Sequence, residues 1–366
     1  MPDGAPGCSI ATAPGAALRT VLTSLEPVPG TPFGVVVTGD GGWSFVSQPG
    51  AGSVGVFRIG RPALPSPVGQ VNTGGPSLGE TLTPGGRYLL AADNTDGAVV
   101  ISVSRAESGA AGALLGTLGS GSADGAIEVA VSPDGRFAFV SLENLASVAV
   151  YNLQRGLAEG FSGPDLVGMI PVGMAPVGLA VSPDGRWLYA TSEAAAGGSA
   201  SGGQGTLSVI SLARAETDPA GSIVSTVDAG CSPVRVITSA GGGVVWVTAR
   251  GSDRLLGFAA ARLRTDPSRS LVASVQVGEA PVGLALVDGG TRIVVADSNR
   301  FGAPNAASSL AVVSVPAALA GRPGLTGYLP AGGFPRQMAL EPDGRTLLVT
   351  NFSSQQLEAV SVADLP

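Results

Sequence analysis

Histidine and lysine are absent from this chain of 366 residues, in which all 20 basic residues are arginine. Without histidine there is no imidazole base, no Ser-His-Asp triad and no histidine ligand for a metal. Without lysine there is no Schiff base and no phosphate-binding P-loop. Most of the common enzyme repertoire is therefore excluded, and any acid–base chemistry rests on aspartate and glutamate.

Cysteine and targeting signals are scarce as well. The two cysteines, Cys8 and Cys231, are too few for a disulfide framework or a cysteine metal site, and we expect two free thiols rather than a bridge. No apolar run is long enough to span a bilayer. The first 20 residues lack a basic region followed by an apolar core, which predicts a cytoplasmic protein, with an exported form that has lost its signal left open.

Charged residues make up 13% of the chain, the formal net charge is −7 and the pI is near 4.7. Nucleic acids and anionic membranes select basic surfaces, so neither is expected as a partner. Hydrophobic residues reach 44%, which indicates a globular, sheet-rich protein. We expect no cofactor and no metal, and a monomer is compatible with this composition.

A repeated unit is the main feature that the sequence does contain, and residues 176–193 (PVGLAVSPDGRWLYATSE) are its clearest copy. Small and large residues alternate through 178–182, as in a strand, and Pro-Asp-Gly-Arg at 183–186 is a turn. Residues 187–191 form a second strand, and the runs at 206–212 and 222–227 supply two more. Four short antiparallel strands at a period of about 50 residues are typical of a β-propeller blade.

Seven such copies follow one another along the chain, but the seventh ends after its third strand. Residues 18–28 form a spare strand near the N-terminus. We therefore predict an all-β fold: a seven-bladed β-propeller of four-stranded antiparallel blades, whose last blade is closed by the N-terminal strand, which leaves no free sheet edge. Residues 1–16 are expected to be a flexible tail and residues 17–366 a single propeller.

The Pro-Asp-Gly-Arg turns around Asp134, Asp184 and Asp343, with the ending Leu-Val-Thr-Asn at 348–351, resemble the YVTN-repeat family and its lactonase-like relatives. The resemblance covers nearly the whole chain and implies a seven-bladed propeller. Relatives of this kind include lactone hydrolases, electron-transfer domains, surface proteins and ligand binders, so the resemblance implies no single function. The histidine-dependent lyase mechanism known for one such propeller is not available to this chain.

In such propellers the innermost strands line a central channel, and ligands usually sit at a mouth formed by the loops leading into those strands and the loops between the second and third strands. Aligning the seven copies at one position of the first strand gives Gly34, Gly79, Glu128, Gly178, Arg235, Gly283 and Gln337. Glycine leaves room around the axis. The three exceptions, together with Glu80 beside Gly79, are therefore candidate ligand contacts.

The loops between the second and third strands add further candidates on the same face. They are Asp93, Asn94, Glu143, Glu193, Arg250, Asp297, Asn299 and Asn351. The acidic loop that begins at Asp93 offers too few oxygen ligands for Ca²⁺ and is interpreted as a turn. Insertions at 194–205 and 300–308 are positioned to cover the mouth as lids.

Two functional hypotheses follow for a small-molecule ligand at this mouth. In the first, the protein is an enzyme: a partly desolvated Glu128 acts as acid or base, Arg235 binds a carboxylate or stabilises an oxyanion, and Glu143 is a second carboxylate, as in lactone or ester hydrolysis, cyclisation or isomerisation. In the second, the propeller binds a ligand or a protein without catalysis. A purely structural Glu128–Arg235 ion pair is the simpler alternative to both.

Overall fold

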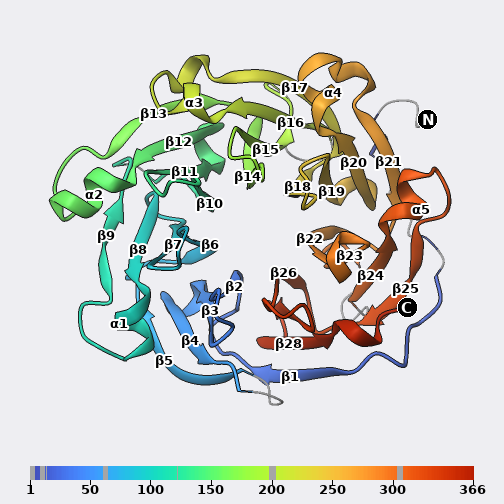
Figure 1. The fold of residues 1–366 in the computed structure, drawn as a ribbon, viewed down its shortest axis with the longest axis horizontal. Coiled ribbons are helices and arrows are strands. Elements are labelled where there is room, and N and C mark those ends of the chain that lie inside the picture. Colours follow the sequence, from blue (N-terminus) through green and yellow to red (C-terminus); the bar gives the residue numbers. More distant parts are fainter. Residues whose placement is uncertain are drawn as a thin grey trace.

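The computed structural model describes residues 5–8, 13, 15–60, 65–121, 123–197, 203–302 and 308–366. It shows seven four-stranded antiparallel sheets arranged as the blades of a ring around a central axis (Figure 1). The predicted all-β, seven-bladed propeller is therefore confirmed. No helix among the described residues is both long enough and apolar enough to cross a membrane.

The strands follow the predicted repeat, and in blades 1–6 they are numbered from the axis outward. Blade 1 comprises β2 (Val35–Val37), β3 (Trp43–Gln48), β4 (Ser53–Arg58) and β5 (Ser66–Asn72). Blade 2 comprises β6 (Ser77–Leu82), β7 (Tyr88–Asp93), β8 (Ala98–Ser102) and β9 (Leu114–Leu118). Blade 3 comprises β10 (Ala126–Val131), β11 (Phe137–Leu142), β12 (Ser147–Asn152) and β13 (Leu166–Pro171).

The second half of the ring repeats the pattern. Blade 4 comprises β14 (Met174–Val181), β15 (Trp187–Ala194), β16 (Gln204–Ser211) and β17 (Ile223–Cys231). Blade 5 comprises β18 (Pro233–Thr238), β19 (Val244–Ala249), β20 (Arg254–Ala259) and β21 (Leu271–Gln276). Blade 6 comprises β22 (Pro281–Val287), β23 (Arg292–Asp297), β24 (Ser309–Ser314) and β25 (Leu325–Pro330).

Blade 7 is built from both ends of the chain. Its inner strands β26 (Pro335–Leu340), β27 (Thr346–Asn351) and β28 (Gln356–Ser361) come from the C-terminal region, and β1 (Thr23–Pro27) is its outermost strand. The antiparallel register runs from Thr23 opposite Val360 to Pro27 opposite Gln356. Figure 1 shows β1 lying beside β28, so the N-terminal strand closes the ring as predicted.

Short helices follow the third strand of most blades. They are α1 (Val103–Glu107), α2 (Leu153–Glu159), α3 (Leu212–Ala215), α4 (Ala260–Thr265) and α5 (Val315–Leu319). The 3₁₀ turns are η1 (Pro49–Ala51), η2 (Glu143–Leu145), η3 (Pro219–Gly221), η4 (Arg250–Ser252), η5 (Pro267–Arg269), η6 (Asp288–Gly290) and η7 (Val362–Asp364).

The turn between the first and second strands of a blade forms from local chemistry. In blade 3, the carboxylate of Asp134 accepts hydrogen bonds from the Ser132 hydroxyl at 2.6 Å and from the Arg136 backbone N–H at 3.1 Å. Gly135 has φ +72°, a conformation that favours glycine. Because every partner lies within a few residues, the Pro-Asp-Gly-Arg pattern is sufficient to place this turn. We call the end of the ring that carries these turns the turn face, and the opposite end the loop face.

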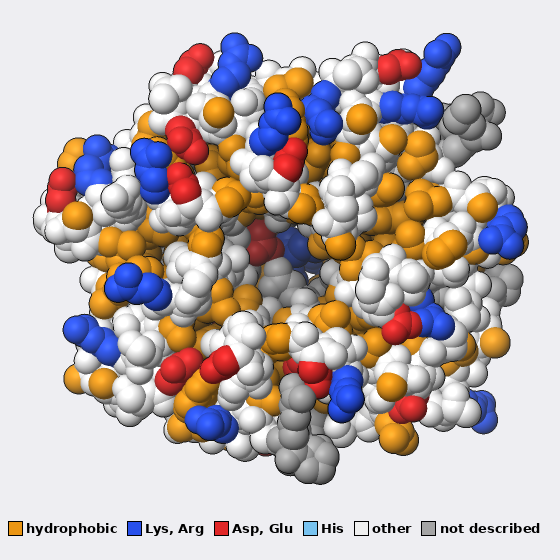
Figure 2. Space-filling model, viewed as in Figure 1, with side chains coloured by type: hydrophobic (Ala, Val, Ile, Leu, Met, Phe, Trp, Pro, Cys, Tyr) orange, Lys and Arg blue, Asp and Glu red, His pale blue; other side chains and the backbone are white. Residues whose placement is uncertain are grey.

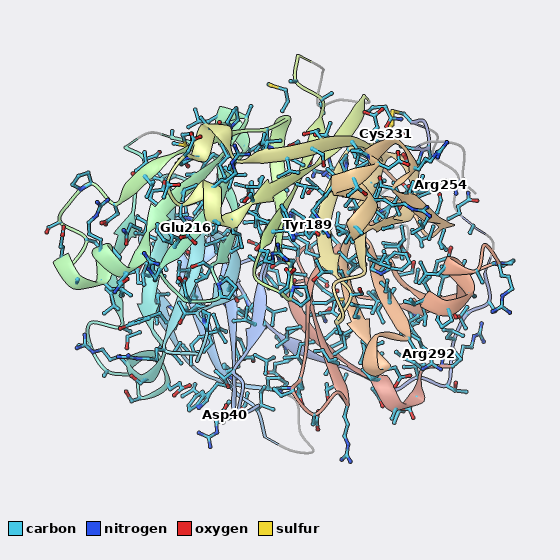
Figure 3. All side chains as sticks on the ribbon, turned by 45° about the horizontal axis from the view of Figure 1, so that its top comes forward. Asp40, Tyr189, Glu216, Cys231, Arg254 and Arg292 are labelled. Carbon is cyan, nitrogen blue, oxygen red and sulfur yellow. A yellow bond between two sulfur atoms is a disulfide. The ribbon has the colours of Figure 1, made fainter. Side chains whose placement is uncertain are left out.

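The N-terminal residues that the structure describes are attached to the ring by a disulfide. Cys8 is bonded to Cys231 at the end of β17, with a Cα–Cα distance of 5.2 Å (Figure 3). The expectation of two free thiols is therefore wrong. The Pro6 carbonyl also accepts a hydrogen bond from the Gln204 side chain at 2.8 Å, and the Gly7 carbonyl accepts one from Ser252 at 3.1 Å.

The same segment continues along the outside of the ring. The backbone N–H of Ala13 donates to the Val277 carbonyl at 3.2 Å, and its carbonyl accepts from the Tyr328 hydroxyl at 2.8 Å. Ala17 then pairs with Tyr328 in a parallel bridge before β1 begins. We call the described residues of this segment, 5–8, 13 and 15–22, the N-terminal strap. The prediction of a flexible tail falls partly on residues 1–4, 9–12 and 14, which lie outside the described residues.

Candidate functional site

A backbone irregularity at the start of the inner strands sets the direction of the channel side chains. The pairing of β10 with β11 shifts register between Ala126 and Glu128, and the pairing of β18 with β19 shifts between Pro233 and Val236. Such bulges re-aim a side chain relative to the regular pleat. Here they coincide with the position that the sequence alignment singles out, since both Glu128 and Arg235 lie at the shift.

Hydroxyl side chains of the second strands hold this position in place. The Glu128 N–H donates to Ser141 Oγ at 3.0 Å, and the Arg235 N–H donates to Thr248 Oγ1 at 3.1 Å. Thr248 in turn donates to the Val282 carbonyl of the next blade at 2.7 Å. Each of these hydroxyl groups connects two strands of its own blade to the neighbouring blade. These hydrogen bonds fix the backbone that carries the channel side chains.

Glu128, Arg235 and Gln337 meet inside the channel although they come from blades 3, 5 and 7. Arg235 Nε lies 3.4 Å from Glu128 Oε2, and both side chains are 9% exposed. Gln337 Nε2 donates to the same carboxylate oxygen at 2.7 Å, and Arg235 Nη1 donates to the Val177 carbonyl at 3.2 Å. Glu128 therefore has charged and neutral donors around it, as expected for an ionised carboxylate in a buried site.

The glycines at the equivalent position make this meeting possible. A Cβ atom added at Gly79 would overlap the Glu128 carboxyl group, and one at Gly34 would lie 3.0 Å from Gln337 Oε1. Glycine at these blades therefore provides the room around the axis that the sequence predicts. At Gly34, however, the nearest atom would be the Leu78 carbonyl oxygen of the next blade, at 2.7 Å, and at Gly178 and Gly283 it would likewise be a backbone carbonyl oxygen of the next blade. Gly79 is therefore required mainly by the Glu128 side chain, and the other three glycines by the close approach of a neighbouring backbone.

Glu80 is a second buried carboxyl group in the same channel, and its surroundings differ from those of Glu128. Neither of its carboxyl oxygens has a hydrogen-bond partner of good geometry. Burial, and then the negative charge of Glu128, raise the pKa of Glu80 well above its usual value, against a weaker opposing effect of the Ser47 backbone. Burial also raises the pKa of Glu128, but Arg235 opposes that shift most strongly. One cavity thus contains an unpaired carboxyl and a paired one.

The cavity bordered by these four side chains measures about 550 Å³. Beyond them its lining consists mainly of later residues of the inner strands, such as Val129–Val131 and Val236–Ile237, so it extends toward the turn face. Figure 2 shows a hollow at the centre of the ring with acidic and basic side chains deep inside it. Apart from Thr81, the remaining lining residues are aliphatic side chains and Gly283, and the charged and amide groups lie at one end of the cavity.

A set of apolar side chains lies one residue closer to the loop face than the aligned position. They are supplied by the residue preceding the aligned position in six blades, and they belong to one packed cluster: Phe33, Leu78, Ile127, Val177, Val234 and Val282. None of them lines the cavity. We call these six residues the apolar ring. Glu128, Arg235, Gln337 and Glu80 therefore face a cavity toward the turn face rather than the loop-face mouth that the sequence interpretation favoured.

Glu143, Glu193 and Arg250 form a separate group at the loop face. Arg250 Nη2 lies 2.7 Å from Glu193 Oε2, and both side chains are 11% exposed. Burial, and then the charge of Glu193, raise the pKa of Glu143. The sequence interpretation joined Glu143 to Glu128 as a second catalytic carboxylate, but the cavity lining includes Glu128 and not Glu143.

The remaining candidates make local contacts within their own blades or with a neighbour. Asp93 accepts from the Thr95 N–H at 3.0 Å, and Asn94 reaches the Ala126 carbonyl at 3.4 Å. Asp297 accepts from Ser309 at 3.0 Å, and Asn351 donates to Glu358 Oε2 at 2.8 Å. Asn299 adopts φ +50° in the loop after β23. None of these five lines the central cavity.

Sequence reasoning did not select Arg336, although a signal for it exists. Arg336 occupies the blade 7 position equivalent to the apolar ring, where the other six blades carry Phe, Leu, Ile or Val. Its guanidinium carbon lies 3.8 Å from the Phe33 ring centroid, 5.0 Å from that of Phe334 and 5.5 Å from that of Phe352. A charged residue that interrupts an apolar column is the pattern that identifies it.

No group of three or more cysteine, aspartate or glutamate side chains within the described ranges is arranged to hold a metal ion. The two insertions interpreted as lids include residues 198–202 and 303–307, which lie outside the described residues. The described part of the site therefore consists of carboxyl, guanidinium and amide groups in an apolar channel.

The fold and this channel define the class of the protein as a seven-bladed β-propeller with a charged pair on its axis. No family model matches the chain, and no curated protein sequence matches it either. Its fold is similar to that of a solved structure described as hydrazine synthase from Kuenenia stuttgartiensis, with a TM-score of 0.73 and 17% identity over 93% of this chain and 98% of that one. At this identity the likeness shows the fold alone, and the resemblance to the YVTN-repeat family stays a prediction.

The unpaired state of Glu80 predicts how stability depends on pH. A carboxyl whose pKa is raised on folding stabilises the protein fully below its unfolded pKa, near 4.5, and this contribution is lost as the pH rises through the folded value. Glu80→Gln removes the titration. We therefore expect the variant to lose less stability than the wild type between about pH 5 and pH 8, as measured by urea unfolding.

A suitable control is Glu159→Gln, because Glu159 is exposed at the end of α2. This control should follow the wild-type profile. Parallel profiles for the wild type and Glu80→Gln would contradict the raised pKa.

Proposed function

We propose that this propeller binds a small uncharged molecule in the central cavity and acts on it by carboxyl acid–base chemistry assisted by Arg235. The observation that carries the proposal is the pairing of unlike carboxyl groups: Glu80 is buried without a partner, whereas Glu128 is held by Arg235 and Gln337. Two carboxyl groups whose environments separate their pKa values are suited to opposite roles as acid and base.

In this proposal Glu80 is the proton donor. Its raised pKa favours the neutral acid, which donates a hydrogen bond to a carbonyl oxygen of the ligand. Glu128 is the base, since its ion pair with Arg235 maintains the carboxylate while burial strengthens it as a proton acceptor. For a lactone or ester, Glu128 takes a proton from the attacking water while Glu80 gives its proton to the developing oxyanion. When the tetrahedral intermediate collapses, Glu80 takes that proton back and the proton on Glu128 passes to the departing alkoxide. For cyclisation or isomerisation, the two carboxyl groups exchange protons with the substrate.

The charge balance of the cavity supports an uncharged ligand. Arg235 and Glu128 cancel each other, and a neutral Glu80 adds nothing. The walls beyond them are formed by aliphatic side chains such as Val131, Leu179 and Leu284. A molecule with an apolar body and one carbonyl group would bury its body against these walls and place the carbonyl at the carboxyl groups.

The test of this function is Glu80→Gln, assayed with a panel of lactones and aryl esters that includes dihydrocoumarin and p-nitrophenyl acetate. Because Glu80 has no partner to lose, the substitution should preserve the fold, and the amide still donates a hydrogen bond. We expect turnover to fall by about 10²–10⁴-fold with little change in KM, as for loss of a general acid.

Glu159→Gln again serves as the matched control and should retain full activity. A wild-type protein that binds these compounds without converting them would favour the non-catalytic hypothesis. Unchanged activity in Glu80→Gln, or the absence of both binding and turnover in the wild type, would contradict the proposal.

We further propose that the protein acts in an oxidising compartment. Disulfides persist in exported proteins and are rare in the cytosol, and the Cys8–Cys231 bond supports the exported alternative over the cytoplasmic prediction. Thiol labelling of the protein in its native cells tests this, because a reduced pair would react with the label after unfolding and a bonded pair would not.

A further inference from the structure

A second charged group lies on the loop-face side of the central cavity, at the level of the apolar ring. It is centred on Arg336, which is half-buried and does not line that cavity. Among the described residues its guanidinium makes no hydrogen bond and no ion pair. This contrasts with Arg235 and Arg250, each of which is paired with a glutamate.

Three phenylalanine rings surround the guanidinium of Arg336. Phe33 belongs to the apolar ring, and Phe334 and Phe352 come from the two loops of blade 7 that reach the loop face. Phe334 and Phe352 are themselves in edge contact, with ring centroids 5.6 Å apart. The rings attract the cation through their faces, but they accept no conventional hydrogen bond. Within the described part of the chain, the five N–H donors of the guanidinium are therefore left for another group.

The electrostatic surroundings of Arg336 are positive. Burial, and then the charges of Arg235, Arg300 and Arg250, lower the pKa of Arg336 well below its usual value, and Glu128 only partly compensates. Arginine retains its proton in proteins, so this shift reflects an unfavourable cation rather than a neutral side chain. An anion placed beside Arg336 would accept hydrogen bonds from its guanidinium and would offset the repulsion from the neighbouring arginines.

A fourth phenylalanine, Phe301, lies against the Arg250 guanidinium of the loop-face group. Phe301 is 56% exposed and lies under the Arg250 guanidinium, at 5.8 Å from its ring centroid. The loop that carries Arg300 and Phe301 reaches the same face, since the charge of Arg300 acts on both Arg336 and Glu143. The loop face therefore combines the guanidinium of Arg336 with aromatic rings. The carboxylate of Glu193 at this face is already paired with Arg250.

We propose that the loop face holds a second binding site, distinct from the central cavity, in which Arg336 binds the carboxylate of a small aromatic acid while Phe334, Phe352 and Phe301 contact its ring. The planar guanidinium matches a carboxylate in bidentate geometry, and edge or offset contacts between rings favour an aromatic body over an aliphatic one. The uncharged ligand proposed for the cavity lacks the carboxylate.

The experiment is calorimetric titration of the purified protein with benzoate, with benzyl alcohol as the neutral analogue and inorganic phosphate as the anion without a ring. Wild type should bind benzoate at least about tenfold more tightly than benzyl alcohol, because a hydrogen bond to a charged partner is the stronger kind. Phosphate should compete weakly. Equal binding of phosphate and benzoate, or no benzoate binding up to about 10 mM, would overturn the proposal.

Arg336→Met tests the residue itself, because methionine preserves an apolar contact with the rings. The variant should lose benzoate affinity by at least about tenfold. It should also unfold at a higher temperature than the ligand-free wild type, since it removes an unpaired, repelled cation. A merely structural arginine would show the reverse: a lower unfolding temperature and unchanged benzoate affinity.

Two further variants separate this site from the rest of the molecule. Arg322→Met removes an exposed arginine elsewhere on the ring and should bind benzoate as the wild type does. Glu80→Gln should also retain benzoate binding, because Glu80 faces the cavity beyond the apolar ring. Loss of benzoate binding in Glu80→Gln would mean that benzoate occupies the cavity, which would overturn the second site but leave the proposed function in place.

Discussion

Arg235→Met is expected to lower the free energy of unfolding by about 3–5 kcal/mol at neutral pH. The substitution leaves Glu128 buried with Gln337 as its remaining side-chain donor, at 2.7 Å, in place of the cation at 3.4 Å. A buried charge that loses its partner keeps its desolvation cost and loses the compensating attraction. Urea unfolding at pH 7, followed by the far-UV signal, measures the effect.

The loss of unfolding free energy caused by Arg235→Met should depend on pH in a defined direction. Arg235 is the strongest influence holding down the pKa of Glu128, so its removal raises that pKa further. A carboxyl with a raised folded pKa stabilises the protein below its unfolded value, near 4.5, and this contribution is lost as the pH rises through the folded pKa. The variant should therefore approach wild-type stability as the pH falls toward 4.5.

The double variant Arg235→Met/Glu128→Gln is the matched control, because it removes both charges and leaves no unpaired ion. It should recover most of the stability that the single variant loses, as replacement of a whole buried pair is often nearly neutral. A deficit that is independent of pH, or a double variant no more stable than Arg235→Met, would show that the buried charge is not the cause.

The second large effect is expected from Cys8→Ser, which removes the bond between residues 223 positions apart. Loss of a native disulfide costs roughly 2–5 kcal/mol, and long closed loops lie toward the upper end in the chain-entropy description. The bond also anchors the N-terminal strap, which pairs with Tyr328 through Ala17 and leads into β1. The cost should appear in urea unfolding of the variant compared with the oxidised wild type.

Reduction gives an independent control for the disulfide prediction. Wild type unfolded in the presence of a thiol reductant should match Cys8→Ser, and Cys231→Ser should behave in the same way. Cys8→Ser itself should be insensitive to the reductant. Equal stability of the oxidised and reduced wild type would contradict the prediction.

Local patterns predicted the scaffold of this protein. The turn at Asp134 and Gly135 uses partners within two residues, so its sequence is sufficient to place it. The count of strands was enough to pair the spare N-terminal strand with the incomplete seventh blade, because an unpaired sheet edge is unfavourable. The sequence also indicated that Glu128, Arg235 and Gln337 lie together at the channel, because equivalent positions in repeated blades lie at equal height around one axis.

The sequence by itself thus determined the seven blades, their closure and the column of residues on the axis, because these follow from periodicity and from interactions between near neighbours. Only the tertiary structure decided that Cys8 reaches Cys231, that Glu80 is unpaired beside a paired Glu128, and that Arg336 lies among three phenylalanine rings. Each of these depends on the depth of burial and on contacts between blades distant in the chain. The pattern of a single repeat contains neither the burial nor these contacts, because both arise only when the ring closes and brings distant blades together.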